Sequence, residues 1–258
     1  MLLALAGGLA IGLLMGALGG GGAILAIPLL VYGFGFSPAQ ATLASLVVVG
    51  VGAAAGVLTQ AHSVDWCRGA FFGVLGLAGA YGGRMLTHSL DGRLLLLAFS
   101  ALLLVVASLM VRKARRSSVR AQGMDAISHP SAFRQGVTLV GAATGVGFLT
   151  GFFGVGGGFA IVPALTLILG FSMATAVGTS LLVILINSFV ALALGVGALP
   201  SLDWSALAPL LAATAVGTLA GTWGGRRVPQ RSLQLAFAIF LYVVAAYMAA
   251  TTLIELMA

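Results

Sequence analysis

The chain has 258 residues, of which 60% are hydrophobic and only 7% are charged, against roughly 25% in soluble domains. Residues 1–64 and 135–202 contain no Asp, Glu, Lys or Arg, which excludes a soluble globular domain and predicts a polytopic membrane protein. The net charge of +7 does not indicate nucleic-acid binding, because many of the basic residues cluster in one loop beside apolar segments: Arg112, Lys113, Arg115, Arg116 and Arg120.

The first half of the chain contains five apolar stretches that we expect to be helices. A helix needs about 20 residues to cross the hydrocarbon core of a bilayer, which is about 30 Å thick. The second stretch would give only about 21 Å of helix, which is too short to cross comfortably. The five stretches run over 2–18, 22–35, 38–60, 67–84 and 92–111.

Five further apolar stretches follow a basic linker at 112–134. The second of them is again too short to cross comfortably. We therefore divide the chain into a first transmembrane repeat at 1–111, the linker, and a second transmembrane repeat at 135–258. The stretches of the second half run over 135–153, 157–170, 173–197, 204–224 and 232–254.

The two halves match each other in sequence. The segment "GALGGGGAILAIP" at 16–28 is followed 135 residues later by "GFFGVGGGFAIVP" at 151–163, which keeps four glycines and the proline in register. Further along, "GAYGGR" at 79–84 is matched by "GTWGGR" at 221–226. Ordered matches of this kind indicate an internal duplication.

The charges of the loops predict that the two repeats have opposite orientations. Loops rich in Lys and Arg usually face the cytoplasm. We therefore expect the linker 112–134 and the loop that carries Arg226, Arg227 and Arg231 to be cytoplasmic. The first-half equivalent of that loop lies one crossing from the linker and must face outside. The expected fold is therefore an all-α polytopic membrane protein of two inverted-topology repeats. Each repeat has a glycine-broken helix pair, either discontinuous or re-entrant, plus three long transmembrane helices.

The glycine clusters are predicted to be helix breaks that bind an anion. Broken helices occur in membranes only where they line a cavity or lie within protein, and the free N–H groups at a half-helix N-terminus attract anions. Glycines that only pack helices are the alternative, since Gly8, Gly12 and Gly16 recur every four residues. The candidate residues are Gly19, Gly20, Gly21, Gly22 and Ala23 in the first copy, and Gly154, Gly156, Gly157, Gly158 and Phe159 in the second.

Five polar side chains near the breaks are further substrate-binding candidates: Thr42, Ser45, Thr179, Ser180 and Asn187. Their hydroxyls could donate hydrogen bonds to an oxyanion, or could bond back to their own helix, as is common in membrane helices. Asn187 is the only Asn in the chain and must have a partner, because burying an unpaired amide is costly. The partner of Asn187 is either the substrate or a group on a neighbouring helix, and the sequence does not decide between them.

The polar residues exclude several other functions. All five acidic residues fall at or near segment ends, which argues against a carboxylate proton relay. Asp65 and Asp203, each followed by Trp, are expected to cap helices. Ser45 and Ser180 have no predicted base beside them in the membrane, so we expect no enzyme. We expect no cofactor and no metal site, and the single Cys67 excludes an intrachain disulfide.

The paired segments "GALGGGGAILAIPLL" and "GFFGVGGGFAIVPAL", with the "ATLASL" and "AVGTSL" that follow, make the chain similar to the TauE/SafE sulfite-exporter family, also called the 4-toluene sulfonate uptake permease family. The resemblance covers essentially the whole chain. It implies a multi-pass permease of the plasma (inner) membrane for small sulfur-containing anions such as sulfite or organosulfonates. It puts Gly19–Gly22, Ser45, Gly154–Gly158, Thr179 and Ser180 at the binding site.

Within the resemblance, the first copy departs from the second by carrying Ala44-Ser45 where the second has Thr179-Ser180. The two halves of the cavity are therefore expected to be chemically unequal. The expected partners are a small sulfur oxyanion or organosulfonate and the lipid bilayer. A secondary transporter that works by alternating access is the leading hypothesis, and an anion channel, or a permease for a different small organic anion, is the alternative. The identity of the anion, the direction of transport and the formation of a homodimer are left open.

Overall fold

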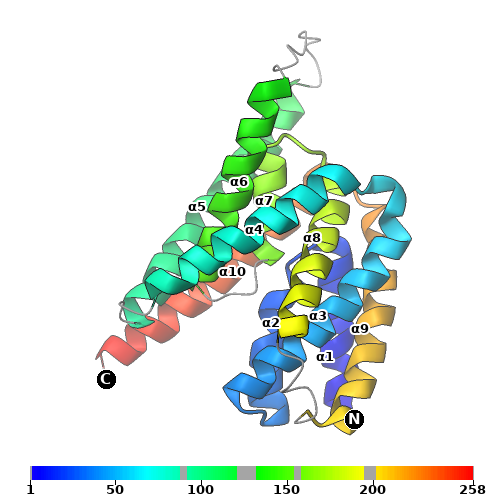
Figure 1. Cartoon of the computed structure of the whole chain (residues 1–258), viewed down its shortest axis with the longest axis vertical. Helices are drawn as coiled ribbons and strands as arrows, with labels where there is room; N and C mark the ends of the chain where they lie inside the picture. Colours follow the sequence, from blue (N-terminus) through cyan, green and yellow to red (C-terminus); the bar gives the residue numbers. More distant parts are fainter. Residues whose placement is uncertain (1, 88–91, 121–131, 154–157, 195–201, 258) are drawn as a thin grey trace.

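The computed structural model describes residues 2–87, 92–120, 132–153, 158–194 and 202–257, and these residues form helices without any strand (Figure 1). The prediction of an all-α membrane protein is confirmed. The elements are α1 (Leu2–Leu18), α2 (Gly22–Pro28), the π-helical η1 (Leu29–Gly33), α3 (Pro38–Gln60), the 3₁₀ turn η2 (Ala61–Ser63), α4 (Trp66–Thr87), α5 (Gly92–Arg120), α6 (Ala132–Phe153), α7 (Gly158–Leu167), α8 (Met173–Leu194), α9 (Trp204–Gly225) and α10 (Gln230–Met257).

Most helices begin and end within three residues of the predicted stretches. The exception is α5, which was predicted to end at residue 111 and reaches Arg120. Arg and Lys are good helix formers, and no Gly or Pro interrupts residues 112–120, so the helix continues into the basic segment. The short apolar segment after the first break changes from α-helix to π-helix directly after Pro28, whose ring has no N–H to donate.

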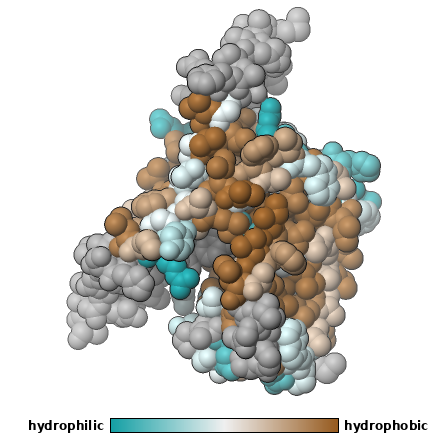
Figure 2. All heavy atoms as spheres, in the orientation of Figure 1, coloured by the Kyte–Doolittle hydropathy of each residue, from teal (hydrophilic) through white to brown (hydrophobic). Residues whose placement is uncertain are grey.

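Six helices in the described part of the chain are long and apolar enough to cross a membrane: α3, α5, α6, α8, α9 and α10. The segment 22–33 and helix α7 give only about 18 Å and about 15 Å of helix, so neither crosses a bilayer alone. Apolar side chains cover much of the surface in Figure 2. Among them, Phe189 and Leu194 are 73% and 87% exposed, as expected for side chains that face lipid.

Equivalent helices of the two repeats exchange partners in the packing. Under the duplication, α1 corresponds to α6 and α4 corresponds to α9. Helix α1 packs along α9, and α6 packs along α4. The corresponding helices α3 and α8 contact each other, as do α5 and α10. A two-fold relation between the repeats produces this pattern, and their opposite orientation in the membrane stays a prediction.

Glycines let the exchanged helices approach closely. A methyl group at Gly12 or Gly16 of α1 would overlap the backbone of α9. In the second repeat, a methyl group at Gly147 or Gly151 of α6 would overlap the backbone of α4. Packing through small residues is the usual means by which membrane helices associate, and it confirms the packing role at these positions.

Side-chain caps fix where several helices begin. Ser37 and Gln40 form a capping box at α3, and the Ser172 hydroxyl accepts a hydrogen bond from the Thr175 backbone N–H at α8. Asp65 accepts a hydrogen bond from the Arg68 N–H at 3.0 Å. Asp203 likewise accepts one at 3.0 Å from the backbone N–H two residues on, so the capping role predicted for both aspartates is confirmed.

We expect Gly147→Ala to lower the free energy of unfolding by about 1–3 kcal/mol, because the added methyl overlaps α4. Gly145→Ala is the matched control on the same helix, since a Cβ there meets no atom within 4 Å. The measurement is unfolding of the purified protein in mixed detergent micelles, followed by circular dichroism as the denaturing detergent increases. Equal stability of the two variants would contradict the close packing of α4 and α6.

Candidate functional site

The first glycine cluster interrupts the chain between α1 and α2. Gly19 has a φ of +83°, a left-handed conformation that favours glycine, and its N–H donates to the Met15 carbonyl at 2.8 Å. Helix α2 then begins at Gly22, and no side chain caps its N-terminus. The predicted helix break at Gly19–Gly22 is therefore present in the structure.

The two breaks lie against each other. A methyl group at Gly20 would overlap the backbone of Gly158, the first residue of α7. A Cβ at Gly19 would lie 2.5 Å from Oγ of Ser180 and 2.7 Å from a methyl of Val162. Thus α1, α2, α7 and α8 meet at one buried point, where the absence of side chains on the glycines lets the backbones approach closely. The candidates Gly154, Gly156 and Gly157 lie outside the described residues.

The serine hydroxyls near the breaks donate to their own helices. Ser45 donates to the Thr42 carbonyl at 2.7 Å, and Ser180 donates to the Val177 carbonyl at 2.8 Å. The hydroxyl of Thr179 accepts a hydrogen bond from the Asp65 backbone N–H at 3.1 Å. Within this structure, the hydroxyl protons of both serines are thus directed at backbone carbonyls.

The remaining candidates have different surroundings. Ala23 is half-buried beside the first break. Phe159 is only 1% exposed, and its ring packs edge-on against Phe99 at 5.1 Å between centroids. Asn187 is half-buried, and its Oδ1 is buried without any hydrogen-bond donor among the described residues. Among the described residues, the predicted partner for the Asn187 side chain is therefore not found for its Oδ1.

One face of α8 connects these features. Val177, Ser180, Ile184 and Asn187 are spaced three, four and three residues apart, which puts them on one side of the helix. A Cβ at Gly19 would contact Val177 and Ser180, and a Cβ at Gly158 would lie 3.0 Å from Ile184. In Figure 1, α8 lies centrally, and it contacts α3 as well as α4 and α7. Both breaks therefore meet the same face of the same helix.

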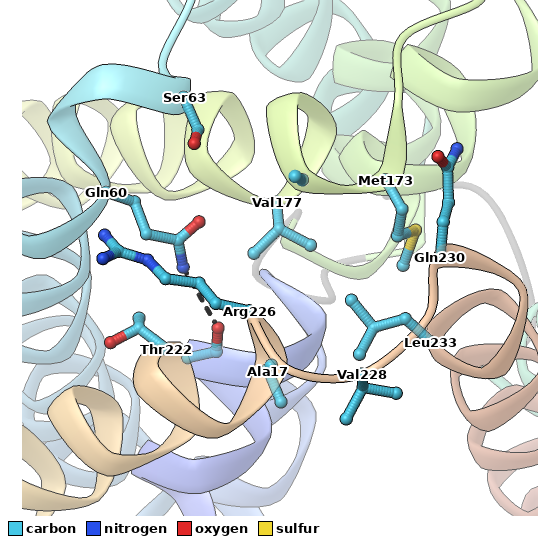
Figure 3. A pocket seen from close by; sticks show the side chains of 13 residues that line it. Ala17, Gln60, Ser63, Met173, Val177, Thr222, Arg226, Val228, Gln230 and Leu233 are labelled. Carbon is cyan, nitrogen blue, oxygen red and sulfur yellow. Dashed lines mark hydrogen bonds between the residues drawn. The ribbon is translucent and has the colours of Figure 1, made fainter.

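A cavity of about 120 Å³ lies beside the first residues of α8, and Figure 3 shows the side chains that line it. Helices α1, α3, α8, α9 and α10 all contribute to its wall, and Val177 also touches Gly19 at the break. The residues that line it are Gly16, Ala17, Gln60, Ser63, Met173, Ala174, Val177, Thr222, Gly225, Arg226, Val228, Gln230 and Leu233.

Gln60 lines this cavity and forms a hydrogen bond to the last turn of α1, beside the first break. The side chain is 6% exposed, and its Nε2 donates to the Gly16 carbonyl at 3.3 Å, the bond drawn dashed in Figure 3. That carbonyl belongs to the last turn of α1, where no helical N–H follows to pair with it. The sequence analysis missed Gln60; the signal available was a neutral polar residue at the end of an otherwise apolar helix.

Two basic side chains donate hydrogen bonds to backbone carbonyls at the C-terminal ends of other helices. Arg226 donates to the Thr59 backbone carbonyl at the end of α3, and Lys113 of α5 donates to the Thr166 carbonyl in the last turn of α7. A cation at a helix C-terminus is favourable, because it faces the negative end of the helix dipole. The half-helix α7 therefore has its glycine end at the breaks and its other end at a lysine.

Comparisons with known proteins show the family to which the chain is similar. The family model described as "Sulfite exporter TauE/SafE" matches residues 4–248. Two proteins of Xylella fastidiosa, from strains Temecula1 and 9a5c, are 39% and 38% identical over 181 residues, and both are named "Probable membrane transporter protein". The match covers 69% of this chain and 67% of each relative. No solved structure shows significant similarity to the chain.

We expect Gln60→Met to lower the free energy of unfolding by about 1–3 kcal/mol, because it leaves the Gly16 carbonyl without its donor while nearly keeping the side-chain volume. Leu58→Met, on the same helix but 80% exposed, is the control and should be neutral. Unfolding in mixed detergent micelles measures both. A neutral Gln60→Met would mean that the Gly16 carbonyl finds another donor.

Proposed function

Because the chain belongs to the TauE/SafE sulfite exporter family of membrane transporters, we propose that it is a plasma-membrane permease for small sulfur-containing anions such as sulfite or organosulfonates. The observation that carries the proposal is the meeting of the two helix breaks, Gly20 against Gly158, on the face of α8 that carries Ser180 and Asn187.

An anion is the substrate class that this meeting point favours. The N-terminus of α2 has no side-chain cap, and each half-helix N-terminus contributes about half a positive charge together with N–H donors. We propose that the backbone N–H groups of Gly20–Ala23 and Gly154–Phe159 bind the anion. Rotation of the Ser45 and Ser180 hydroxyls away from their own helices would add two donors. The NH2 group of the Asn187 side chain, rather than its Oδ1, would donate to the substrate beyond the breaks.

The proposed mechanism is alternating access. We propose that the close contact between Gly20 and Gly158 closes the path between the cavity and Asn187. Rocking of one repeat against the other would part this contact and expose the site to the opposite side. A channel would instead need a continuous path. The serine hydroxyls bond to backbone carbonyls rather than to a base, which supports a transporter rather than a hydrolase.

We expect purified protein in liposomes to carry radiolabelled sulfite with saturable kinetics and with stimulation by sulfite on the opposite side. We expect Gly20→Ala to abolish this flux, because its methyl overlaps Gly158. Gly21→Ala is the matched control, since its Cβ would lie 3.4 Å from the Phe240 ring, and it should keep most of the flux. Flux without saturation would identify a channel, and the absence of flux with any sulfur anion would contradict the proposed substrate class.

The proposed topology puts the linker 112–134 and the start of α4 on the cytoplasmic side. Cys67 is the only cysteine and is exposed in the first turn of α4, so the natural protein can report this orientation. We expect a membrane-impermeant maleimide to label Cys67 in inside-out vesicles and not in intact spheroplasts. Cys67→Ser is the control for background labelling. Labelling only from the outside would reverse the proposed topology.

A further inference from the structure

We propose that the cavity at the start of α8 is a second anion-binding site, where a small oxyanion binds from the cytoplasmic side before it reaches the glycine breaks. This inference rests on the proposed function, since it names a further site for the same substrate. The sequence-based binding candidates lie at the breaks and along the helices beside them. From the sequence, Arg226 is expected to anchor the helix end or to guide anions at the mouth of a cavity, and the cavity residues Gln60 and Thr222 are not among the candidates.

The charge around the cavity favours an anion. Its lining contains the guanidinium of Arg226 and no acidic residue. Two long helices also begin at its wall: Met173 and Ala174 are the first residues of α8, and Gln230 is the first residue of α10. The N–H groups of a first helical turn have no partner within the helix, and the dipole end there is positive.

The donors in the cavity suit an oxyanion of sulfite size. Figure 3 shows the Arg226 side chain running beside Gln60 toward α3, where it donates to the Thr59 carbonyl. A guanidinium has five N–H donors in a planar fork, so donors are left for an anion after that bond.

The cavity also lies in position to act on the breaks. Gln60 holds the Gly16 carbonyl at the end of α1, and Val177 lines the cavity while touching Gly19. An anion that draws the Gln60 N–H toward itself would release the end of α1 directly above the first break. Binding of an anion in the cavity would therefore weaken the contact between Gly20 and Gly158, which closes the proposed transport path.

The test compares two neighbouring arginines. We expect Arg226→Gln to raise the KM for sulfite transport, and the Kd for sulfite binding to the purified protein, about tenfold. Arg227→Gln removes the same charge but should leave both constants unchanged, because the Arg227 guanidinium lies over the Trp223 ring, 3.5 Å from its centroid, and does not line the cavity. Arg226→Lys should give an intermediate KM. The liposomes contain phosphatidylcholine only, so that no anionic lipid headgroup competes.

Ala174→Asp provides a second variant that is expected to fold normally. Ala174 is exposed at the second position of α8, where a carboxylate is favourable for the helix but repels an anion in the cavity. We expect this variant to unfold like the wild type and to lose sulfite binding.

The outcomes separate this proposal from the proposed function. If the wild type transports sulfite while Arg226→Gln behaves like Arg227→Gln, the cavity proposal is wrong and the transporter stands. If the wild type carries no sulfur anion, the binding measurement still decides whether sulfite binds through Arg226. An Arg226 effect that appears only in liposomes with anionic lipid would identify a headgroup site and overturn the proposal.

Discussion

The two helix breaks can meet only because Gly20 carries no side chain, and a Cβ at Gly158 would also be tight, 3.0 Å from the Gly20 backbone. A single methyl group at Gly20 would overlap the Gly158 backbone, so α2 and α7 would separate. The face of α8 would then lose contact with one break or the other, since Gly19 lies against Ser180 and Gly158 lies near Ile184. The central arrangement of both repeats thus depends on backbone-to-backbone contact at one point, which no other residue type permits.

Helices that end inside a bilayer leave backbone groups that lipid cannot satisfy. The structure meets this demand with single side chains brought from distant segments. Gln60 supplies a donor to the end of α1, and Lys113 supplies one to the end of α7. At the N-terminus of α2 no side chain takes this role, and the N–H groups of Ala23 and Ile24 donate to the carbonyls of Gly20 and Gly21 at 3.3 and 3.4 Å. Under the proposed function, the contrast between these C-terminal ends and the N-terminus of α2, which no side chain caps, would favour a negatively charged substrate.

Much of the fold could be predicted from the sequence, because apolar stretches, glycine breaks and the duplication all leave local patterns. The ends of α1, α3 and α9 follow them to within a residue. The cavity could not be predicted in the same way. Gln60 pairs with Gly16 across 44 residues, and Arg226 reaches Thr59 across 167, so neither contact leaves a spacing signal. The sequence could not decide either whether the Ser and Thr hydroxyls donate to a substrate or to their own helix. Rotation about a single side-chain bond changes a hydroxyl from one role to the other.

The duplication also explains why the two sides of such a permease need not be equivalent. The Gly-Gly-Arg that ends in Arg226 has a counterpart that ends in Arg84, so an exchange of roles between the repeats would bring Arg84 to a matching cavity on the other side. The amide has no such counterpart, since the 135-residue shift aligns Gln60 with Gly195. Under the proposed alternating-access mechanism, the repeated residues would line the path from either side, whereas the unrepeated Gln60 bonds to the end of α1 on one side only. The inward-facing and outward-facing states would then differ in free energy, because one state would have a buried hydrogen bond that the other cannot form.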